Sequence, residues 1–322
     1  MNIKTSPKSL IVATLFSVAI FASSTAYAIQ LNSDIEGGSG PFNALLLQAA
    51  GTPDVAVVLM HGRTSNPDGA VVRQARNALN SAGYTTISIV NPHAGSYLSG
   101  QREFPDYIAD IDALNYAFPE AYARIRTAIN YLSDLGVKKV VLLGFSMGSR
   151  FMSAHIANNK KNEPPIIGFI GVGMVATSIA PLNQALTLES VTVPVLDIYG
   201  DDDIKAANSV STRRAAYGGD STSYTVNRLD CASGLPVNDC HKLKGLKTLD
   251  GKGCRVFENS IITWVIANAP LATAQDKGVC VGFTGGVGDG GGNTGGGLNT
   301  GGGGIHFGLL VILVVRLFYK KS

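Results

Sequence analysis

Charged residues are scarce in this chain: only 15% of its 322 residues are charged, and the basic ones form no dense cluster in the body of the sequence. Five of the basic residues lie at the two extreme ends, and between these ends acidic residues slightly outnumber basic ones. A protein that binds nucleic acid needs a dense basic face to neutralise phosphates. The sequence therefore argues against nucleic acid as a partner.

Long apolar runs are missing as well, because no uninterrupted stretch reaches the roughly 20 residues of a typical membrane-spanning helix. This excludes a protein that crosses the membrane many times. Hydrophobic residues nevertheless make up 45% of the chain, which also contains 38 glycines. Such a composition is typical of one globular domain with appendages and argues against a disordered or collagen-like chain.

The N-terminus has the three parts of a secretory signal peptide, which we predict over residues 1–28. Two lysines precede an apolar run at residues 10–22, and the tripeptide AYA at residues 26–28 places small residues at both positions read by the signal peptidase. We therefore expect export and a mature chain that begins at Ile29. The alternative is an uncleaved membrane anchor, for which the apolar run is short.

The C-terminus has two further segments after the expected globular domain, residues 29–283. Residues 284–304 form a glycine-rich linker, in which 13 of the 20 residues from 285 to 304 are glycine. This composition predicts a flexible tether, because it offers too little apolar surface to offset the entropy of ordering. Residues 305–322 then combine a short hydrophobic helix with a basic tail.

This C-terminal pattern resembles the GlyGly-CTERM sorting tails of some Gram-negative bacteria. The resemblance implies a rhomboid-type membrane protease as a partner, and display or release of the domain at the cell surface. A plain membrane anchor is the alternative, and in both cases the basic end is expected on the cytoplasmic side. The expected location is therefore periplasmic or cell-surface, with the protein anchored by the C-terminal helix or released from it.

All four cysteines, Cys231, Cys240, Cys254 and Cys280, lie in the last third of the expected domain. In an exported protein they are expected to form disulfides, with three possible connectivities. We favour Cys231 with Cys240 and Cys254 with Cys280, because sequence neighbours close the smaller loops. A zinc site that includes His241 is the competing interpretation, but no CxxC spacing supports it, and we expect no metal and no cofactor.

Six apolar, β-rich runs alternate with segments of helical period in the body of the chain. The runs span residues 55–60, 85–90, 139–143, 166–172, 193–199 and 224–229, and the helical segments span residues 70–82, 121–135, 148–157 and 255–267. Continuous apolar runs are typical of strands buried on both faces. The order predicts a doubly wound α/β fold with a mostly parallel central sheet and helices on both faces, to which residues 29–53 add short edge strands.

The strongest local signal is the GxSxG motif Gly144-Phe145-Ser146-Met147-Gly148, placed directly after an apolar strand and before a helical segment. A serine on such a tight turn projects its hydroxyl from the sheet, and small neighbours allow the close backbone approach that the turn requires. The motif alone is weak, because a glycine-rich chain of this length contains it easily by chance, and a turn serine without a catalytic partner is the alternative.

Further features support this motif. Before it, an HG turn at residues 61–63 ends an earlier strand. After it, three aspartates at residues 201–203 follow a buried strand, and His241 follows the last strand in an expected loop, which gives the chain order serine, acid, histidine. Residues 54–268 therefore resemble the α/β-hydrolase superfamily of serine hydrolases, and are most similar to small esterases of the carboxylesterase and dienelactone-hydrolase type.

The resemblance implies a role for each residue. Ser146 is the nucleophile, His241 the general base and acid, and Asp203 the carboxylate that orients the imidazole, while the backbone amides of Arg63 and Met147 form the oxyanion hole. Dienelactone hydrolases carry cysteine where this chain has Ser146, so their lactone specificity is not carried over.

Three alternatives stay open at this point. His93 is a second candidate for the base, although its place in the chain order is wrong for the fold, and Asp201 or Asp202 is an alternative acid. The segment between the strand that ends near residue 175 and the strand that starts at residue 193 is too short for a large lid, which favours a short-chain ester, a thioester or a polymer-borne ester as substrate. A peptidase or a non-catalytic surface binding domain on the same scaffold is the alternative function.

Several polar side chains of the expected loops are further candidates for substrate contacts. Arg63, Tyr97 and Arg102 are suited to an acidic or polar substrate. Solvated loop residues are the simpler interpretation of these side chains.

Overall fold

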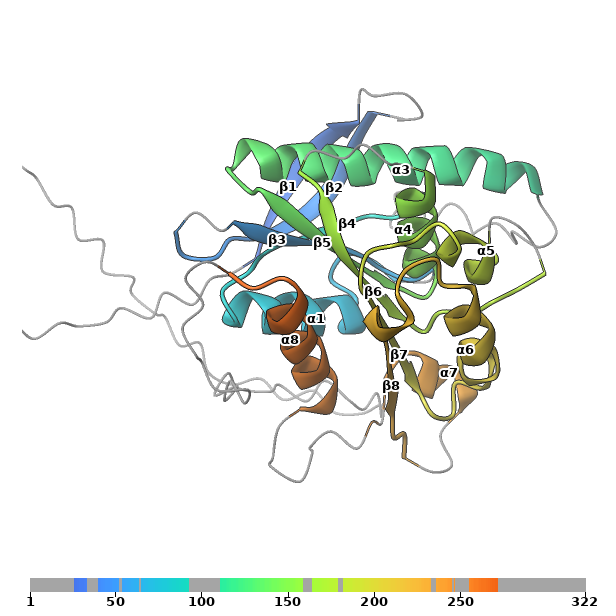
Figure 1. The fold of residues 1–322 in the computed structure, drawn as a ribbon. Helices are drawn as coiled ribbons and strands as arrows, with labels where there is room; N and C mark the ends of the chain where they lie inside the picture. The colour runs from blue at the N-terminus through green and yellow to red at the C-terminus, as the bar shows by residue number, and fades with distance from the viewer. Residues whose placement is uncertain are drawn as a thin grey trace, which may run out of the picture. The chain divides into compact units, whose positions relative to one another are not determined.

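A computed structural model describes most of the chain between residues 26 and 271 (Figure 1). The described ranges are 26–33, 40–51, 54–63, 65–92, 111–158, 164–178, 182–232, 236–244, 246 and 255–271. They all belong to the first of the two units into which the chain divides, residues 1–282 and 283–322. Most of the predicted signal peptide, the glycine-rich linker, the C-terminal helix, Cys254 and Cys280 lie outside the described residues, as do His93, Tyr97 and Arg102.

The fold is an eight-stranded sheet in the order β1-β2-β4-β3-β5-β6-β7-β8. The strands are β1 (Tyr27–Ser33), β2 (Gly40–Leu47), β3 (Val55–Met60), β4 (Thr85–Ile89), β5 (Lys139–Phe145), β6 (Ile166–Val172), β7 (Val195–Gly200) and β8 (Tyr224–Leu229). From β4 to β8 all neighbouring strands are parallel, whereas β1 and β2 form an antiparallel edge. This architecture confirms the predicted α/β fold, including the edge strands.

Helices cover both faces of the sheet. They are α1 (Ala70–Ser81), α3 (Ile111–Asp134), α4 (Met147–Asn158), α5 (Gln184–Leu188), α6 (Ile204–Ala216), α7 (Val237–His241) and α8 (Val256–Asn268), with a 3₁₀ turn η1 (Ser221–Ser223). Helices α3 and α4 pack on one face, and α1 and α8 pack on the other.

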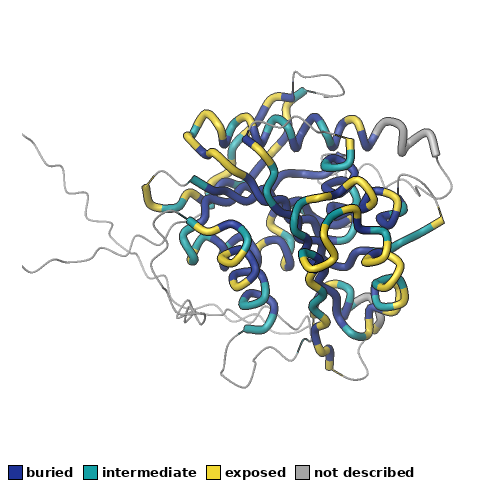
Figure 2. Tube along the Cα trace, in the orientation of Figure 1, coloured by how far each residue is buried: buried dark blue, intermediate teal, exposed yellow. Residues whose placement is uncertain are grey.

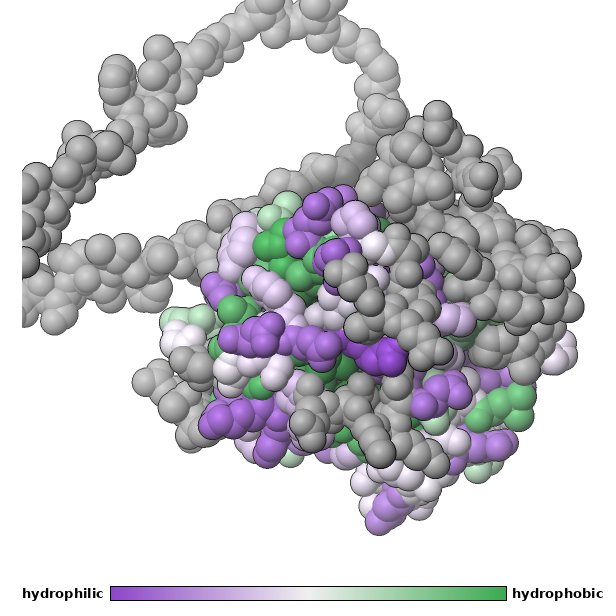
Figure 3. Space-filling model, turned by 90° about the horizontal axis from the view of Figure 1, so that it is seen from above, coloured by the Kyte–Doolittle hydropathy of each residue, from purple (hydrophilic) through white to green (hydrophobic). Residues whose placement is uncertain are grey.

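Two apolar cores result, one on each face of the sheet. Along β3, Ala56, Val58 and Met60 belong to the core under α3 and α4, and the residues between them belong to the core under α1 and α8. This alternation explains why the strands read as continuous apolar runs. Figure 2 shows the central strands in dark blue, whereas the helices alternate between buried and exposed residues. On the face in Figure 3, hydrophilic residues lie between smaller hydrophobic areas.

The predicted helices differ from the structure mainly in α3, which begins at Ile111 rather than at residue 121. Pro119 lies inside this helix, where proline lacks the backbone donor of other residues and usually ends or kinks a helix. Buried Ala117 and Phe118 pack into the core before the proline and extend the helix. Helices α5, α6 and α7 were not predicted.

A buried ion pair attaches α6 to the sheet. Arg213 Nε donates to Asp197 Oδ2 on β7 over 2.9 Å, and the Tyr224 hydroxyl donates to the same oxygen over 2.7 Å. Burial and the adjacent carboxylate raise the pKa of Tyr224, so the phenol stays a neutral donor. These contacts fix the direction of α6, and therefore the position of Asp203, which caps the start of this helix.

The predicted signal-peptide cleavage site lies inside the first strand. Tyr27 and Ala28 pair with Leu46 and Leu45 in the antiparallel edge, so cleavage after Ala28 leaves Ile29–Ser33 of β1 paired. None of the helices in the described part of the chain has the length and hydropathy that a membrane span requires.

Candidate active site

Ser146 occupies the turn between β5 and α4 with a strained backbone. Its φ angle is +52°, in the left-handed region that residues other than glycine rarely adopt. Such a conformation costs about 1–3 kcal/mol and persists only where the surroundings impose it. Here the Ser146 amide donates to the Val172 carbonyl over 2.8 Å. The turn therefore holds the hydroxyl at the carboxyl edge of the sheet.

The glycine at position 148 is required by close packing under this turn. A Cβ atom there would lie 2.3 Å from the Met60 carbonyl oxygen, which belongs to the backbone of β3. Because backbone cannot yield as a flexible side chain does, α4 approaches β3 this closely only with glycine. The GxSxG motif thus performs the packing role that its sequence predicts.

His241 lies between a serine and a carboxylate. Its Nε2 atom is 2.9 Å from Ser146 Oγ, and its Nδ1 atom is 2.6 Å from Asp203 Oδ2. An ionised carboxylate only accepts hydrogen bonds, so Nδ1 carries a proton, and in the neutral imidazole Nε2 accepts from the serine hydroxyl. The structure therefore brings together the three residues that the sequence singled out.

The imidazole of His241 is also held from its sides. The Phe145 ring lies 5.4 Å away between centroids, and a Cβ atom on Gly173 would lie 2.9 Å from His241 Cε1. The prediction that His241 lies in a loop is wrong, since it is the last residue of the short helix α7. A five-residue helix with no apolar stripe gives no periodic signal in the sequence.

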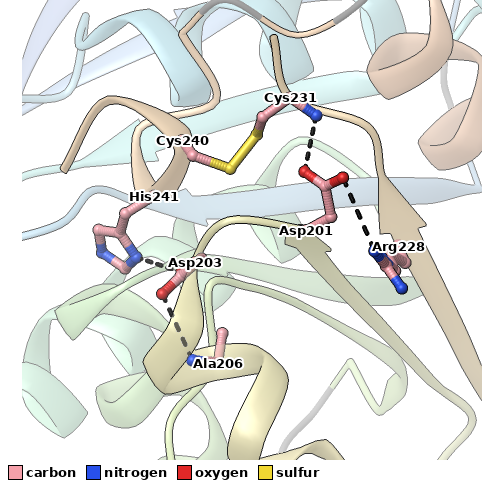
Figure 4. Close-up of a disulfide and its surroundings, with 7 residues drawn as sticks. All are labelled: Asp201, Asp203, Ala206, Arg228, Cys231, Cys240 and His241. Atoms are coloured by element: carbon pink, nitrogen blue, oxygen red, sulfur yellow. Dashed lines mark hydrogen bonds and ion pairs between the residues drawn. A yellow bond between two sulfur atoms is a disulfide. The ribbon is translucent and has the colours of Figure 1, made fainter. Parts of the chain in front are cut away.

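Among the three consecutive aspartates, only Asp203 contacts the histidine (Figure 4). It caps α6, where its Oδ1 accepts from the Ala206 amide over 3.3 Å, and it is buried. Asp201 points elsewhere: it accepts from the Cys231 amide over 2.8 Å and lies 3.7 Å from Arg228. Asp202 is exposed. The geometry thus favours Asp203, which the resemblance named as the acid, over its two neighbours.

A disulfide joins Cys231, just after β8, to Cys240, the residue before His241 (Figure 4). This is one of the two disulfides that we favoured from the sequence. Among the described residues, the one possible metal-ligand group combines both of these cysteines with Asp201. With the sulfurs joined to each other no thiolate is available to a metal, and His241 is not part of that group. The disulfide instead attaches α7 to the sheet.

We expect the Cys231→Ser/Cys240→Ser double variant to lose both stability and turnover. Opening so small a loop is expected to lower the free energy of unfolding by about 3 kcal/mol. Without the disulfide α7 is free to move, which displaces the imidazole of His241. A displacement of about 1 Å lowers the rate by on the order of 100-fold. Denaturant unfolding and kcat on an aryl ester measure the two effects. Wild-type protein incubated with a reductant is the matched comparison, and unchanged kcat in both would contradict this role of the disulfide.

A buried hydrogen-bond network supports the HG turn after β3. The backbone amide of Asn91 donates to His61 Nε2 over 3.1 Å. The other ring nitrogen, Nδ1, therefore carries the proton and donates to the Gly62 carbonyl over 2.7 Å. Burial lowers the pKa of His61 to about 4, with a smaller effect in the same direction from Arg124, so this imidazole is neutral. His61 is therefore a structural residue of the turn.

Arg124 on α3 completes this network, and no sequence signal indicates its role. Its Nη1 donates to the carbonyls of Val90 and Asn91 over 3.1 and 2.8 Å, and its guanidinium pairs with Glu120 one turn earlier on the helix. Residues more than 30 positions apart in the chain thus fix the turn.

A cavity of about 670 Å³ opens at Ser146. Its lining includes both predicted oxyanion residues, Arg63 and Met147, together with Ser146, Asp203 and His241. Between β6 and β7 the described residues form only the five-residue helix α5, in agreement with the prediction that no large lid is inserted there. The cavity accommodates a small ester beside the serine.

The chain is similar to known hydrolases. Residues 45–217, more than half of the chain, match the model of a family described as phospholipase/carboxylesterase. No curated protein matches the chain.

Three solved structures share the fold. A dienelactone hydrolase from Anabaena variabilis is 16% identical with a TM-score of 0.51, covering 76% of this chain and 98% of that one. A cold-adapted esterase from an Arctic intertidal metagenomic library is 18% identical with a TM-score of 0.51, covering 68% and 90%. The 2,6-dihydroxy-pseudo-oxynicotine hydrolase is 15% identical with a TM-score of 0.52, covering 77% and 69%. These likenesses confirm the α/β-hydrolase fold.

Proposed function

Because the chain belongs to the phospholipase/carboxylesterase family, we propose that it is a serine esterase that works through an acyl-enzyme. The observation that carries the proposal is the continuous chain of hydrogen bonds from Ser146 through His241 to Asp203. A hydroxyl is a poor nucleophile until a base takes its proton, and a buried carboxylate fixes the tautomer of that base. The cavity beside Ser146 supplies room for the ester.

In the acylation step, Ser146 Oγ bonds to the ester carbonyl carbon while its proton passes to His241 Nε2. The carbonyl electron pair moves onto oxygen, and the amides of Arg63 and Met147 donate to the resulting oxyanion, each worth about 3 kcal/mol. When the intermediate collapses, the bond to the alcohol oxygen breaks and the imidazolium returns the proton to that oxygen. Asp203 stabilises the imidazolium throughout.

Deacylation repeats these steps with water. His241 Nε2 takes a proton from water as its oxygen bonds to the acyl carbon. The bond to Ser146 Oγ then breaks, the serine regains its proton, and the free acid leaves.

A labelled fluorophosphonate tests this proposal, because it reacts only with an activated serine. We expect the folded wild-type protein to be labelled at Ser146 and to hydrolyse p-nitrophenyl esters. Ser146→Ala is expected to abolish both, whereas Ser211→Ala, at an exposed position on α6, leaves both unchanged. Absence of labelling at Ser146, or equal ester turnover in Ser146→Ala, would reject the serine mechanism and favour a binding domain.

We also propose that the protein acts outside the cytoplasm, exported by residues 1–28 and held at or released from the cell surface by residues 305–322. The Cys231–Cys240 disulfide supports this location, because disulfides persist in oxidising compartments. Mass spectrometry of the exported protein measures both ends. A chain that retains residues 1–28 contradicts cleavage of the signal peptide, and an intact C-terminus contradicts processing of the tail.

A further inference from the structure

The cavity at Ser146 is lined by many more cationic than anionic side chains. Its cationic residues are Arg63, Arg150, Lys205, Lys242 and Lys244. Among the described residues of the lining there is one carboxylate, Asp203, and this group is engaged with His241. Before reaction, a neutral ester gains little from such an imbalance, whereas an anionic substrate gains from each nearby positive charge.

Arg150 is the central member of this group. It lies on α4, four residues after Ser146, and both residues line the cavity. Its side chain is partly buried, and among the described residues none forms a hydrogen bond or an ion pair with its guanidinium. The buried arginines Arg76, Arg124 and Arg213 each pair with a carboxylate. Arg150 differs from them in facing a cavity.

The state of Arg150 without a ligand is electrostatically unfavourable. Burial, and next the positive charge of Arg63, lower the pKa of Arg150 to about 10, which still leaves the guanidinium charged at neutral pH. A partly buried charge without a counter-ion costs free energy, which an entering anion offsets. A guanidinium binds a carboxylate through two parallel hydrogen bonds, and this geometry makes carboxylate a suitable ligand.

The three lysines differ from Arg150 in exposure. Lys205, Lys242 and Lys244 are exposed, and Lys244 already lies 3.6 Å from Asp239. Exposed charges attract an anion from solution more than they hold it, and salt screens them. Arg63 is exposed as well. We therefore assign binding to Arg150, and attraction of the substrate to Arg63, Lys205 and Lys242.

We propose that the cavity selects esters that carry a second, ionised carboxylate near the scissile bond, such as monoesters of short dicarboxylic acids, and that Arg150 binds this carboxylate. The proposal rests on the proposed serine esterase activity and adds the class of its substrate.

The test compares two substrates of equal acyl length, p-nitrophenyl hydrogen glutarate and p-nitrophenyl valerate. For the full-length wild type we expect kcat/KM to be at least about 10-fold higher for the glutarate ester, since a charge-assisted bond is worth on the order of 10-fold to 100-fold. Arg150→Gln is expected to lower this ratio by about the same factor. Arg214→Gln removes the same charge from an exposed site on α6 outside the cavity, and is expected to leave the ratio unchanged.

A second measurement needs no variant, so a folding defect in Arg150→Gln does not weaken the test. Glutarate is expected to inhibit wild-type hydrolysis of p-nitrophenyl valerate competitively, whereas the neutral glutaramide does not. Equal kcat/KM for the two esters, or equal inhibition by the two compounds, overturns the carboxylate proposal and leaves the esterase standing. Stronger inhibition by glycerol 3-phosphate than by glutarate also overturns it, in favour of a phosphate. Absence of turnover and of fluorophosphonate labelling instead rejects the esterase itself.

Discussion

Replacement of His241 by alanine is expected to lower kcat for ester hydrolysis by on the order of 10⁶-fold, while KM changes little. The imidazole is the group at hydrogen-bond distance from both Ser146 Oγ and Asp203, so its loss leaves the hydroxyl without a base. Because the proton moves only in the transition state, the loss falls on kcat rather than on binding. Steady-state kinetics over a series of aryl esters of increasing chain length measure kcat and KM separately.

Two controls distinguish chemistry from structure in this variant. Denaturant unfolding shows whether the fold survives, and the rate of fluorophosphonate labelling at Ser146 is expected to fall together with kcat. Imidazole added to the buffer enters the space left in the cavity and is expected to restore part of the turnover, because it supplies the missing base. A stable variant that retains wild-type kcat would remove His241 from the mechanism.

The central strands were predictable from the sequence because both faces of a parallel sheet are buried. Every residue of β3 is buried, so the whole strand reads as one apolar run. Helix α6 had no such signal. Over its 13 residues only Ala206 and Arg213 are buried, so its sequence has no apolar stripe, and the ion pair of Arg213 with Asp197 attaches it to the sheet. An ion pair across 16 positions leaves no local pattern.

The candidate site was likewise predictable only in part. Ser146 has a local motif, and His241 follows from its place in the chain order. The three neighbouring aspartates are the same residue type and all lie within three positions of the end of β7. The geometry of the turn separates them, because Asp203 faces His241 whereas Asp201 faces Cys231. The support of the HG turn by Asn91 and Arg124 depends on contacts across the fold, which no spacing in the sequence encodes.

Asp203→Asn is expected to lower kcat by on the order of 10⁴-fold with little change in stability. An amide in place of the carboxylate can donate to Nδ1 of His241, which puts the ring proton on Nε2, where it no longer accepts from Ser146. The fold is expected to tolerate the change, because asparagine caps a helix as well as aspartate does, and the cap bond to Ala206 remains available. We therefore expect kcat to fall while the free energy of unfolding stays close to that of the wild type.

Asp201→Asn is the matched control, since it makes the same chemical change two residues away. The side-chain oxygen of the asparagine still accepts from the Cys231 amide, and the lost contact with Arg228 spans 3.7 Å at an exposed arginine, a kind of ion pair worth at most about 1 kcal/mol. We expect kcat within about 5-fold of wild type, because about 1 kcal/mol changes a rate by a factor of about 5. Equal losses in the two variants would mean that the carboxylates act through the shape of the turn, and a larger loss in Asp201→Asn would transfer the role of the acid to Asp201.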